Sequence, residues 1–301
     1  MTSPHFVQAL GWLRDTLGPE ARFREGQWEA IAALVERRER TLVVQATGWG
    51  KSLVYFMATR LLRAQGAGPT ILISPLLSLM RNQIASAARW SVKAQSLNST
   101  NVDEHPRIEA DLLAGKIDLL LISPERLAND RFQSEVWSEL CHKVGLLVVD
   151  EVHCISDWGH DFRPNYRRIM RLLDEIPPGT PVIGTTATAS DRVVADVAAI
   201  LGALNIQRGS LTRESLKLYV YPEPMDSAQR LSLLSYLLKH LPGSGIIYCT
   251  TTRDCRLVAE WLQSEGILAK AYYADVEEVE SEDRESLEDQ LMRNQLKVLV
   301  A

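Results

Sequence analysis

The 301-residue sequence lacks paired cysteines, membrane-spanning runs and a surplus of basic residues. No two of its four cysteines stand at CxxC spacing, which argues against a disulfide framework and against a structural zinc site. No apolar run is long enough to cross a bilayer, and the first residues lack the layout of a signal peptide. We therefore expect a cytoplasmic protein, in a reducing compartment, with no membrane partner.

The formal net charge at pH 7 is −5, which taken alone argues mildly against a nucleic-acid partner. The charge is unevenly placed, however. Residues 275–289 hold nine carboxylates and only one base, Arg284, so this stretch carries −8 and the rest of the chain +3. Such a stretch is most simply a solvated helix face or loop. The overall charge therefore does not exclude binding to DNA or RNA.

The segment around which the chain is organised is residues 41–52, TLVVQATGWGKS. A short apolar strand is followed by a turn through two glycines, and an amphipathic helix opens at Lys51. This pattern is typical of a phosphate-binding loop, in which Lys51 reaches the β- and γ-phosphates and the Ser52 hydroxyl ligates Mg²⁺. Gln45 stands where the general pattern has glycine, and a chance GKS in a strand–turn–helix is the alternative. The predicted nucleotide-binding residues here are Ala46, Thr47, Gly48, Trp49, Gly50, Lys51 and Ser52.

A second candidate for nucleotide contact precedes the helix predicted over residues 28–37. The Gln27 side chain has both a donor and an acceptor, which suits the edge of adenine. Phe23 or Arg24 would support the base. An ordinary helix start explains the same residues, and this alternative stays open.

Near-continuous apolar strands alternate with helices over the first two thirds of the sequence. This alternation predicts an α/β fold with a parallel sheet covered on both faces. The strands are expected at residues 41–45, 70–74, 92–97, 118–123, 144–150 and 182–186. Functional residues are expected at the carboxyl ends of such strands, where the GKS loop, Asp150 and Thr188 fall.

A polar linker at residues 212–216 is expected to introduce a second α/β unit. Its strands are predicted at residues 217–221, 245–249, 268–273 and 297–300, and its helices at 227–240, 253–265 and 282–294. We therefore predict domains over residues 1–211 and 212–301. Because residues 296–301 (LKVLVA) form a strand pattern with nothing after it, we expect the second domain to be incomplete.

Asp150 and Glu151 follow an apolar strand downstream of the phosphate loop. Hydrolysis of ATP needs one carboxylate for Mg²⁺ and another group that orients the attacking water. Asp150 suits the first role and Glu151 the second, since adjacent residues at a strand end point in different directions. The alternative is a pair of solvated acids.

The aromatic-rich stretch 153–164 follows directly. Trp158 and Phe162 would stack on unpaired bases, and Arg163 would contact phosphate. A packed loop with core aromatics is the alternative. We discount a metal site, because Cys154 is a lone cysteine.

Together these segments resemble the helicase core of the RecQ family, within helicase superfamily two. The matching motifs cover nearly the whole chain in the family's order. They are FREGQ (23–27), ATGWGKS (46–52), SPLLSLMRNQ (74–83), SPERL (123–127), DEVH (150–153), CISDWGHDFRPNYRR (154–168), TTATAS (185–190) and GIIYCTTTR (245–253). By this resemblance His153 would link the γ-phosphate site to the DNA loop, and would act with Lys51, Asp150 and Glu151.

The resemblance implies two RecA-like P-loop domains with parallel sheets, the second incomplete. It also implies an ATP-dependent DNA helicase of 3′-to-5′ polarity that uses ATP and Mg²⁺. Such a helicase would act on single-stranded and forked DNA in repair or recombination, and would be nucleoid-associated if bacterial. It names no protein partner. The family's γ-phosphate arginines would follow residue 301, so residues 1–301 are expected to bind nucleotide but to be impaired in hydrolysis and unwinding. A non-motor ATP- or nucleic-acid-binding module and an RNA helicase of the same superfamily are the alternatives.

Overall fold

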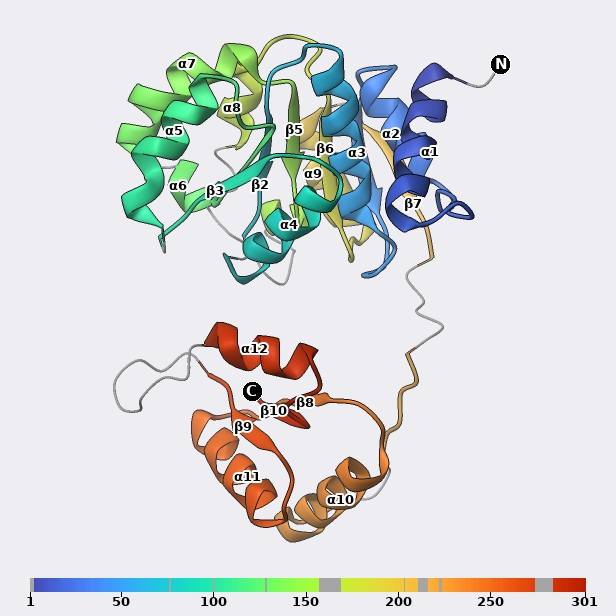
Figure 1. Ribbon diagram of the computed structural model, residues 1–301, viewed down its shortest axis with the longest axis vertical. Helices are drawn as coiled ribbons and strands as arrows, with labels where there is room; N and C mark the ends of the chain where they lie inside the picture. Colours follow the sequence, from blue (N-terminus) through green and yellow to red (C-terminus); the bar gives the residue numbers. More distant parts are fainter. Residues whose placement is uncertain are drawn as a thin grey trace. The chain divides into compact units, whose positions relative to one another are not determined.

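The computed structural model describes residues 3–75, 77–99, 101–127, 129–156, 169–202, 204–210, 216–221, 224–273 and 284–301. The chain divides into two compact units, Met1–Leu216 and Lys217–Ala301. Both are built from a parallel sheet and helices, as Figure 1 shows for each unit. The predicted α/β fold with parallel sheets is therefore confirmed.

The first unit is organised around a seven-stranded sheet of order β3-β4-β2-β5-β6-β1-β7. The strands are β1 (Arg40–Val44), β2 (Thr70–Ile73), β3 (Ala94–Leu97), β4 (Leu119–Ile122), β5 (Leu146–Val149), β6 (Val182–Thr186) and β7 (Asn205–Arg208). All pair in parallel, with Val44 opposite Thr186 and Ile73 opposite Val149. The register brings the ends of β1, β2, β5 and β6 to one edge of the sheet. The loops that follow these strands lie at that edge.

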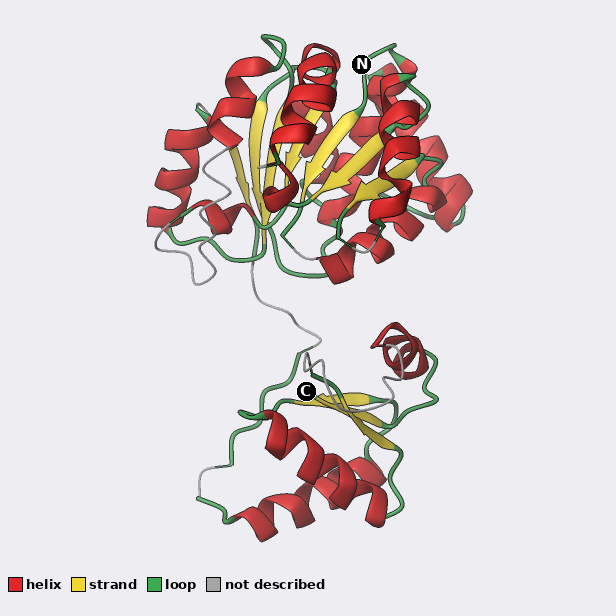
Figure 2. Cartoon of the chain, turned by 90° about the vertical axis from the view of Figure 1, so that its left-hand side faces the viewer, coloured by secondary structure: helices red, strands yellow, loops and turns green. Residues whose placement is uncertain are grey.

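Helices cover both faces of this sheet, as Figure 2 shows. One layer contains α1 (Pro4–Leu17), α2 (Gln27–Val35), α3 (Lys51–Ala64) and α4 (Leu77–Arg89), and the other contains α5 (His105–Leu113), α8 (Ile169–Glu175) and α9 (Asp191–Leu201). Successive strand residues enter opposite layers: Leu42 packs in the layer of α9, and Val43 in the layer of α3. Burial on both faces explains why the strands are almost wholly apolar.

Shorter helical segments join these elements. They are η1 (Val102–Glu104), α6 (Pro124–Leu127), the π-helix η2 (Phe132–Trp137), α7 (Ser138–Leu140), η3 (Cys141–Lys143) and η4 (Val152–Ile155). Three parts of the first unit were not expected from the sequence. They are the separate short segments α6, η2, α7 and η3, the helix α8, and the strand β7. The alternating half-buried and exposed residues of β7 form no apolar run.

The second unit contains a three-stranded sheet of order β8-β10-β9. Its strands are β8 (Gly245–Ile247), β9 (Ala269–Ala271) and β10 (Val298–Val300), and its helices α10 (Ser227–His240), α11 (Thr252–Ser264) and α12 (Arg284–Met292). Cys255, Ala259 and Leu262 of α11 pack against β10.

The strand predicted at residues 217–221 is wrong. The described residues 216–221 are not in a strand, and Leu218, Tyr219 and Val220 are each more than 80% exposed. A strand needs a neighbour to pair its backbone groups, and the described residues offer this segment none. No helix in the described ranges is both long and apolar enough to span a bilayer.

Candidate nucleotide-binding site

The predicted phosphate loop connects the end of β1 to the start of α3. Gln45 continues the β ladder through its amide, which donates to the Thr186 carbonyl at 3.1 Å. Gly48 and Gly50 have φ values of 86° and 99°, in the left-handed region that side chains disfavour. Gly50 caps α3, so Lys51 is the first residue of the helix and Ser52 the second. The glycine turn and helix start predicted from the sequence are thus present.

The Lys51 side chain folds back over this loop. Its Nζ donates to the Gln45 carbonyl at 2.7 Å and lies 3.5 Å from the Ala46 carbonyl. Burial lowers the pKa of Lys51, and the negative charges of Glu151 and Asp150 oppose this shift. The ammonium group therefore lies within the electrostatic field of both carboxylates. The structure thus brings the predicted phosphate-binding Lys51 near the two predicted catalytic carboxylates, Asp150 and Glu151.

Gln27 and Arg24 hold the outside of the loop. Gln27 is 2% exposed. Its Oε1 accepts from the Arg24 amide at 2.9 Å, and its Nε2 donates to the Trp49 carbonyl at 3.0 Å. The Arg24 guanidinium donates to the Gly48 carbonyl. A Cβ atom on Gly50 would lie 2.7 Å from Gln27 Nε2, so a side chain there would displace the Gln27 amide from the loop. The bonds of Gln27 to the Arg24 amide and the Trp49 carbonyl leave one N–H and one lone pair of its side-chain amide unused.

Asp150 follows β5 and is 7% exposed. Its Oδ1 accepts from the Thr185 hydroxyl at 2.5 Å, and its Oδ2 accepts from Gln83 Nε2 at 3.1 Å. Burial raises the pKa of Asp150, and the nearby Glu151 charge adds to this, whereas the bonds from Thr185 and Gln83 oppose it. The two donors fix the carboxylate at the end of β5.

Glu151 and His153 begin a chain of polar contacts across the sheet edge. Glu151 has a φ of 48°, an unusual backbone conformation for a residue with a side chain. His153 Nδ1 lies 3.2 Å from Glu151 Oε2 and 3.0 Å from the Thr186 hydroxyl oxygen. The Thr186 hydroxyl donates to the Thr188 carbonyl at 2.9 Å. The turn after β5 is thereby joined to the turn after β6.

Sequence reasoning did not assign Gln83, Thr185 and Thr186 to the site. Their motifs were recognised, since Gln83 ends SPLLSLMRNQ and both threonines begin TTATAS. Because these residues are far in sequence from Asp150 and His153, no local pattern predicts their hydrogen bonds to those two residues. The pairing of β5 with β2 and β6 brings these segments together.

Trp158, Phe162 and Arg163 lie outside the described residues. Ser156 is the last described residue before these three, and its hydroxyl donates to Asp196 Oδ2 of α9 at 2.5 Å. The start of the aromatic-rich segment is therefore tied to the helix that follows TTATAS. The roles predicted for these three residues stay predictions.

Comparison with known proteins places these residues in a family. A model of the DEAD/DEAH box helicase family matches residues 24–197. ATP-dependent DNA helicase RecQ of Haemophilus influenzae is 34% identical over 297 residues, covering 97% of this chain and 45% of the relative. Putative ATP-dependent DNA helicase Q1 of Caenorhabditis elegans is 35% identical over 292 residues, covering 93% of this chain and 44% of the relative.

Solved structures share the fold at lower identity. Dbp5 of S. cerevisiae bound to RNA and ADP BeF3 superposes with a TM-score of 0.72 at 17% identity, over 99% of this chain and 73% of that chain. The DUF1998 helicase MrfA bound to DNA gives a TM-score of 0.73 at 15% identity, over 96% of this chain and 43% of that chain.

The chain spans slightly less than half the length of the two curated relatives. The family match includes the phosphate loop, Asp150 and His153, and the RecQ resemblance expected from the motifs is confirmed. The chain therefore belongs to the DEAD/DEAH box helicase family and, within it, to the RecQ-type proteins.

Proposed function

We propose that this chain carries the ATP site of an ATP-dependent DNA helicase that moves 3′-to-5′ along single-stranded DNA. Membership of the DEAD/DEAH box family implies ATP binding. The observation that carries the proposal is the electrostatic interaction of Lys51 with Asp150 and Glu151, because it joins charges from two separate segments of the chain beside the glycine turn. The domain assignments, 1–211 for the ATP-binding domain and 212–301 for part of a second RecA-like domain, belong to the same proposal.

Lys51 and the loop amides of residues 46–52 would hold the phosphates. An ammonium and a helix N-terminus both favour the negative charge of a triphosphate. Arg24 and Gln27 would contact the base from the outer side of the loop, to which both are hydrogen-bonded. Movement of Lys51 from the Gln45 carbonyl to phosphate would exchange a neutral acceptor for a charged one, which strengthens the hydrogen bond.

Ser52 and Asp150 would hold Mg²⁺ together with phosphate oxygens. Hydroxyl and carboxylate oxygens are suitable ligands for this hard cation, and phosphates commonly complete its shell. When bound, Mg²⁺ would neutralise charge on the phosphate oxygens. The Thr185 and Gln83 donors would orient the Asp150 carboxylate, leaving its other lone pairs for the cation.

Glu151 would orient the attacking water and accept its proton. The Glu151 carboxylate contacts His153, and His153 contacts Thr186. Because the Thr186 hydroxyl gives its proton to the Thr188 carbonyl, we assign the proton of the His153–Thr186 bond to His153 Nδ1. A change in the turn after β6 would therefore alter the position of Glu151. This is the proposed route by which nucleic acid affects hydrolysis.

DNA is proposed as the partner because the curated relatives are named DNA helicases. Trp158 and Phe162 would stack on bases and Arg163 would contact the backbone, each stack contributing roughly 1–3 kcal/mol. Single-stranded and forked DNA, and a role in repair or recombination, remain part of the proposal. Residues 1–301 by themselves would bind nucleotide but hydrolyse it slowly and not unwind DNA. The reason is that an arginine finger at the γ-phosphate contributes about 10³–10⁵ to the rate of hydrolysis.

The test is ATP hydrolysis by the full-length protein with single-stranded DNA, with RNA of the same sequence, and without nucleic acid. The proposal predicts strong stimulation by DNA and weak stimulation by RNA. Stronger stimulation by RNA would favour an RNA helicase, and ATP binding without stimulation by either would favour a non-motor module. A fork with a 3′ single-stranded tail, compared with a 5′ tail, tests the polarity.

A further inference from the structure

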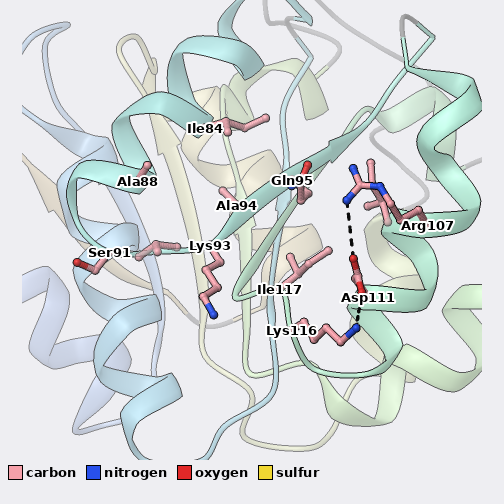
Figure 3. A pocket seen from close by; sticks show the side chains of 12 residues that line it. Ile84, Ala88, Ser91, Lys93, Ala94, Gln95, Arg107, Asp111, Lys116 and Ile117 are labelled. Atoms are coloured by element: carbon pink, nitrogen blue, oxygen red, sulfur yellow. Dashed lines mark hydrogen bonds and ion pairs between the residues drawn. The ribbon is translucent and has the colours of Figure 1, made fainter.

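A hollow of 510 Å³ lies at the outer edge of β3, the edge strand of the large sheet. Ile84 and Ala88 of α4 line one side, and Arg107 and Asp111 of α5 line another (Figure 3). These helices belong to opposite layers of the unit. The hollow therefore opens between the two layers, with the strand edge at its base.

The backbone of β3 has a free edge facing this hollow. β3 pairs with β4, and in the described part of the chain no strand pairs with its other side. The Lys93 carbonyl accepts from the Asp118 amide at 2.9 Å, whereas the Ser96 carbonyl accepts from the Asn101 side chain at 2.7 Å. Because successive residues of a strand direct their backbone groups to alternate sides, the amide and carbonyl of Ala94 face outward.

The lining of the hollow is positively charged, although the whole chain is negative. Three cations, Lys93, Arg107 and Lys116, line it with a single carboxylate, Asp111. Asp111 is already engaged, at 2.8 Å from Lys116 Nζ and 3.9 Å from the Arg107 guanidinium. The Asp118 carboxylate accepts from the Lys93 backbone amide at 3.0 Å, but no carboxylate among the described residues forms an ion pair with Lys93 Nζ. An incoming acidic group would therefore meet an unmatched charge.

We propose that this hollow binds an acidic, extended segment of a partner protein as an additional strand beside β3. The Ala94 amide and carbonyl would pair with the incoming backbone, as in other cases of strand addition. Apolar side chains of the segment would contact Ile84 and Ile117, and its carboxylates would meet Lys93. The lining contains no aromatic ring for base stacking, which favours a peptide over nucleic acid. The proposal is independent of the ATP site.

The test uses a fluorescent peptide of alternating aspartate and valine, with a lysine–valine peptide as its charge-reversed control. Fluorescence anisotropy should show binding of the acidic peptide only. Lys93→Glu should weaken it about fivefold or more, the effect of reversing one exposed charge. Lys143→Glu is the matched control, since Lys143 is an exposed lysine that lines a separate hollow. Circular dichroism would confirm that both variants are folded.

Strand pairing is separated from simple charge attraction by two N-methylated peptides. One is methylated at every aspartate amide and the other at every valine amide, so each blocks one backbone edge. Pairing with β3 predicts that one isomer binds like the parent and the other loses binding. The proposal is overturned if no acidic peptide binds, if both isomers bind or both fail, if Lys143→Glu weakens binding equally, or if single-stranded DNA displaces the peptide.

Discussion

The side-chain amide of Gln83 donates a hydrogen bond to the Asp150 carboxylate at 3.1 Å. Gln83 lies on α4, after the first Ser-Pro turn, and Asp150 lies at the end of β5. By the RecQ resemblance, the motif that ends at Gln83, SPLLSLMRNQ, would line the track for single-stranded nucleic acid. The contact would therefore connect the track directly to the proposed Mg²⁺ ligand.

Replacing Gln83 by leucine should reduce ATP hydrolysis about tenfold, because a charged acceptor loses a hydrogen bond with a cost of about 1–3 kcal/mol. Nucleotide affinity should change less, since Lys51 and the loop amides stay in place. Steady-state hydrolysis and binding of a fluorescent ATP analogue measure the two effects. Asn82→Ala, an exposed neighbour on the same helix, is the control. Equal losses in both variants would mean that α4 was disturbed as a whole.

Asp150→Asn should abolish hydrolysis yet raise thermal stability without nucleotide. Burial raises the pKa of Asp150 above its ordinary 3.8, so the folded state holds the proton more tightly than the unfolded state. Stability from this group is lost as pH rises from 3.8 through the raised pKa, and at neutral pH the buried charge destabilises the fold. Melting curves from acidic to neutral pH should show the advantage of asparagine growing with pH. Asp103→Asn, at an exposed site, should show no such trend.

Thr186→Val should uncouple hydrolysis from DNA by removing the hydroxyl that His153 contacts. Basal hydrolysis should persist, while stimulation by single-stranded DNA should fall about tenfold, as expected for a lost buried hydrogen bond. Thr186→Ser keeps the hydroxyl and should restore stimulation. If serine fails as valine does, packing of the methyl group rather than the hydrogen bond is what matters.

Glu151→Gln should keep ATP binding and lower hydrolysis about 10²–10⁴-fold, since the amide preserves shape but does not accept the proton of water. Single-turnover measurements with bound ATP separate the chemical step from binding. A parallel fall in affinity and turnover would assign Glu151 a structural role.

Much of the site was predictable from short-range patterns. Gly48, Gly50 and Lys51 lie in one turn whose conformation depends on neighbouring residues, and Asp150 ends an apolar strand. The contacts from Gln83 and Thr185 depend on the order of β2, β5 and β6, which no local pattern states. The strand predicted at residues 217–221 failed for a related reason, because apolar alternation does not supply a neighbouring strand. β7 was missed because only one of its four residues, Ile206, is apolar, and that residue is exposed.

The most direct test of the account is ATP hydrolysis by the full-length protein and its Lys51→Ala variant, with saturating single-stranded DNA. Lys51 is the first residue of α3 after the glycine turn, and its ammonium interacts electrostatically with both carboxylates. The Lys51→Ala variant should lose hydrolysis, a fall of at least about 10³-fold, because alanine cannot replace the charged contact of the lysine with phosphate. DNA binding without nucleotide should be retained and confirms that the variant is folded. Turnover by the variant close to that of the parent would contradict the assignment of this loop as the ATP site.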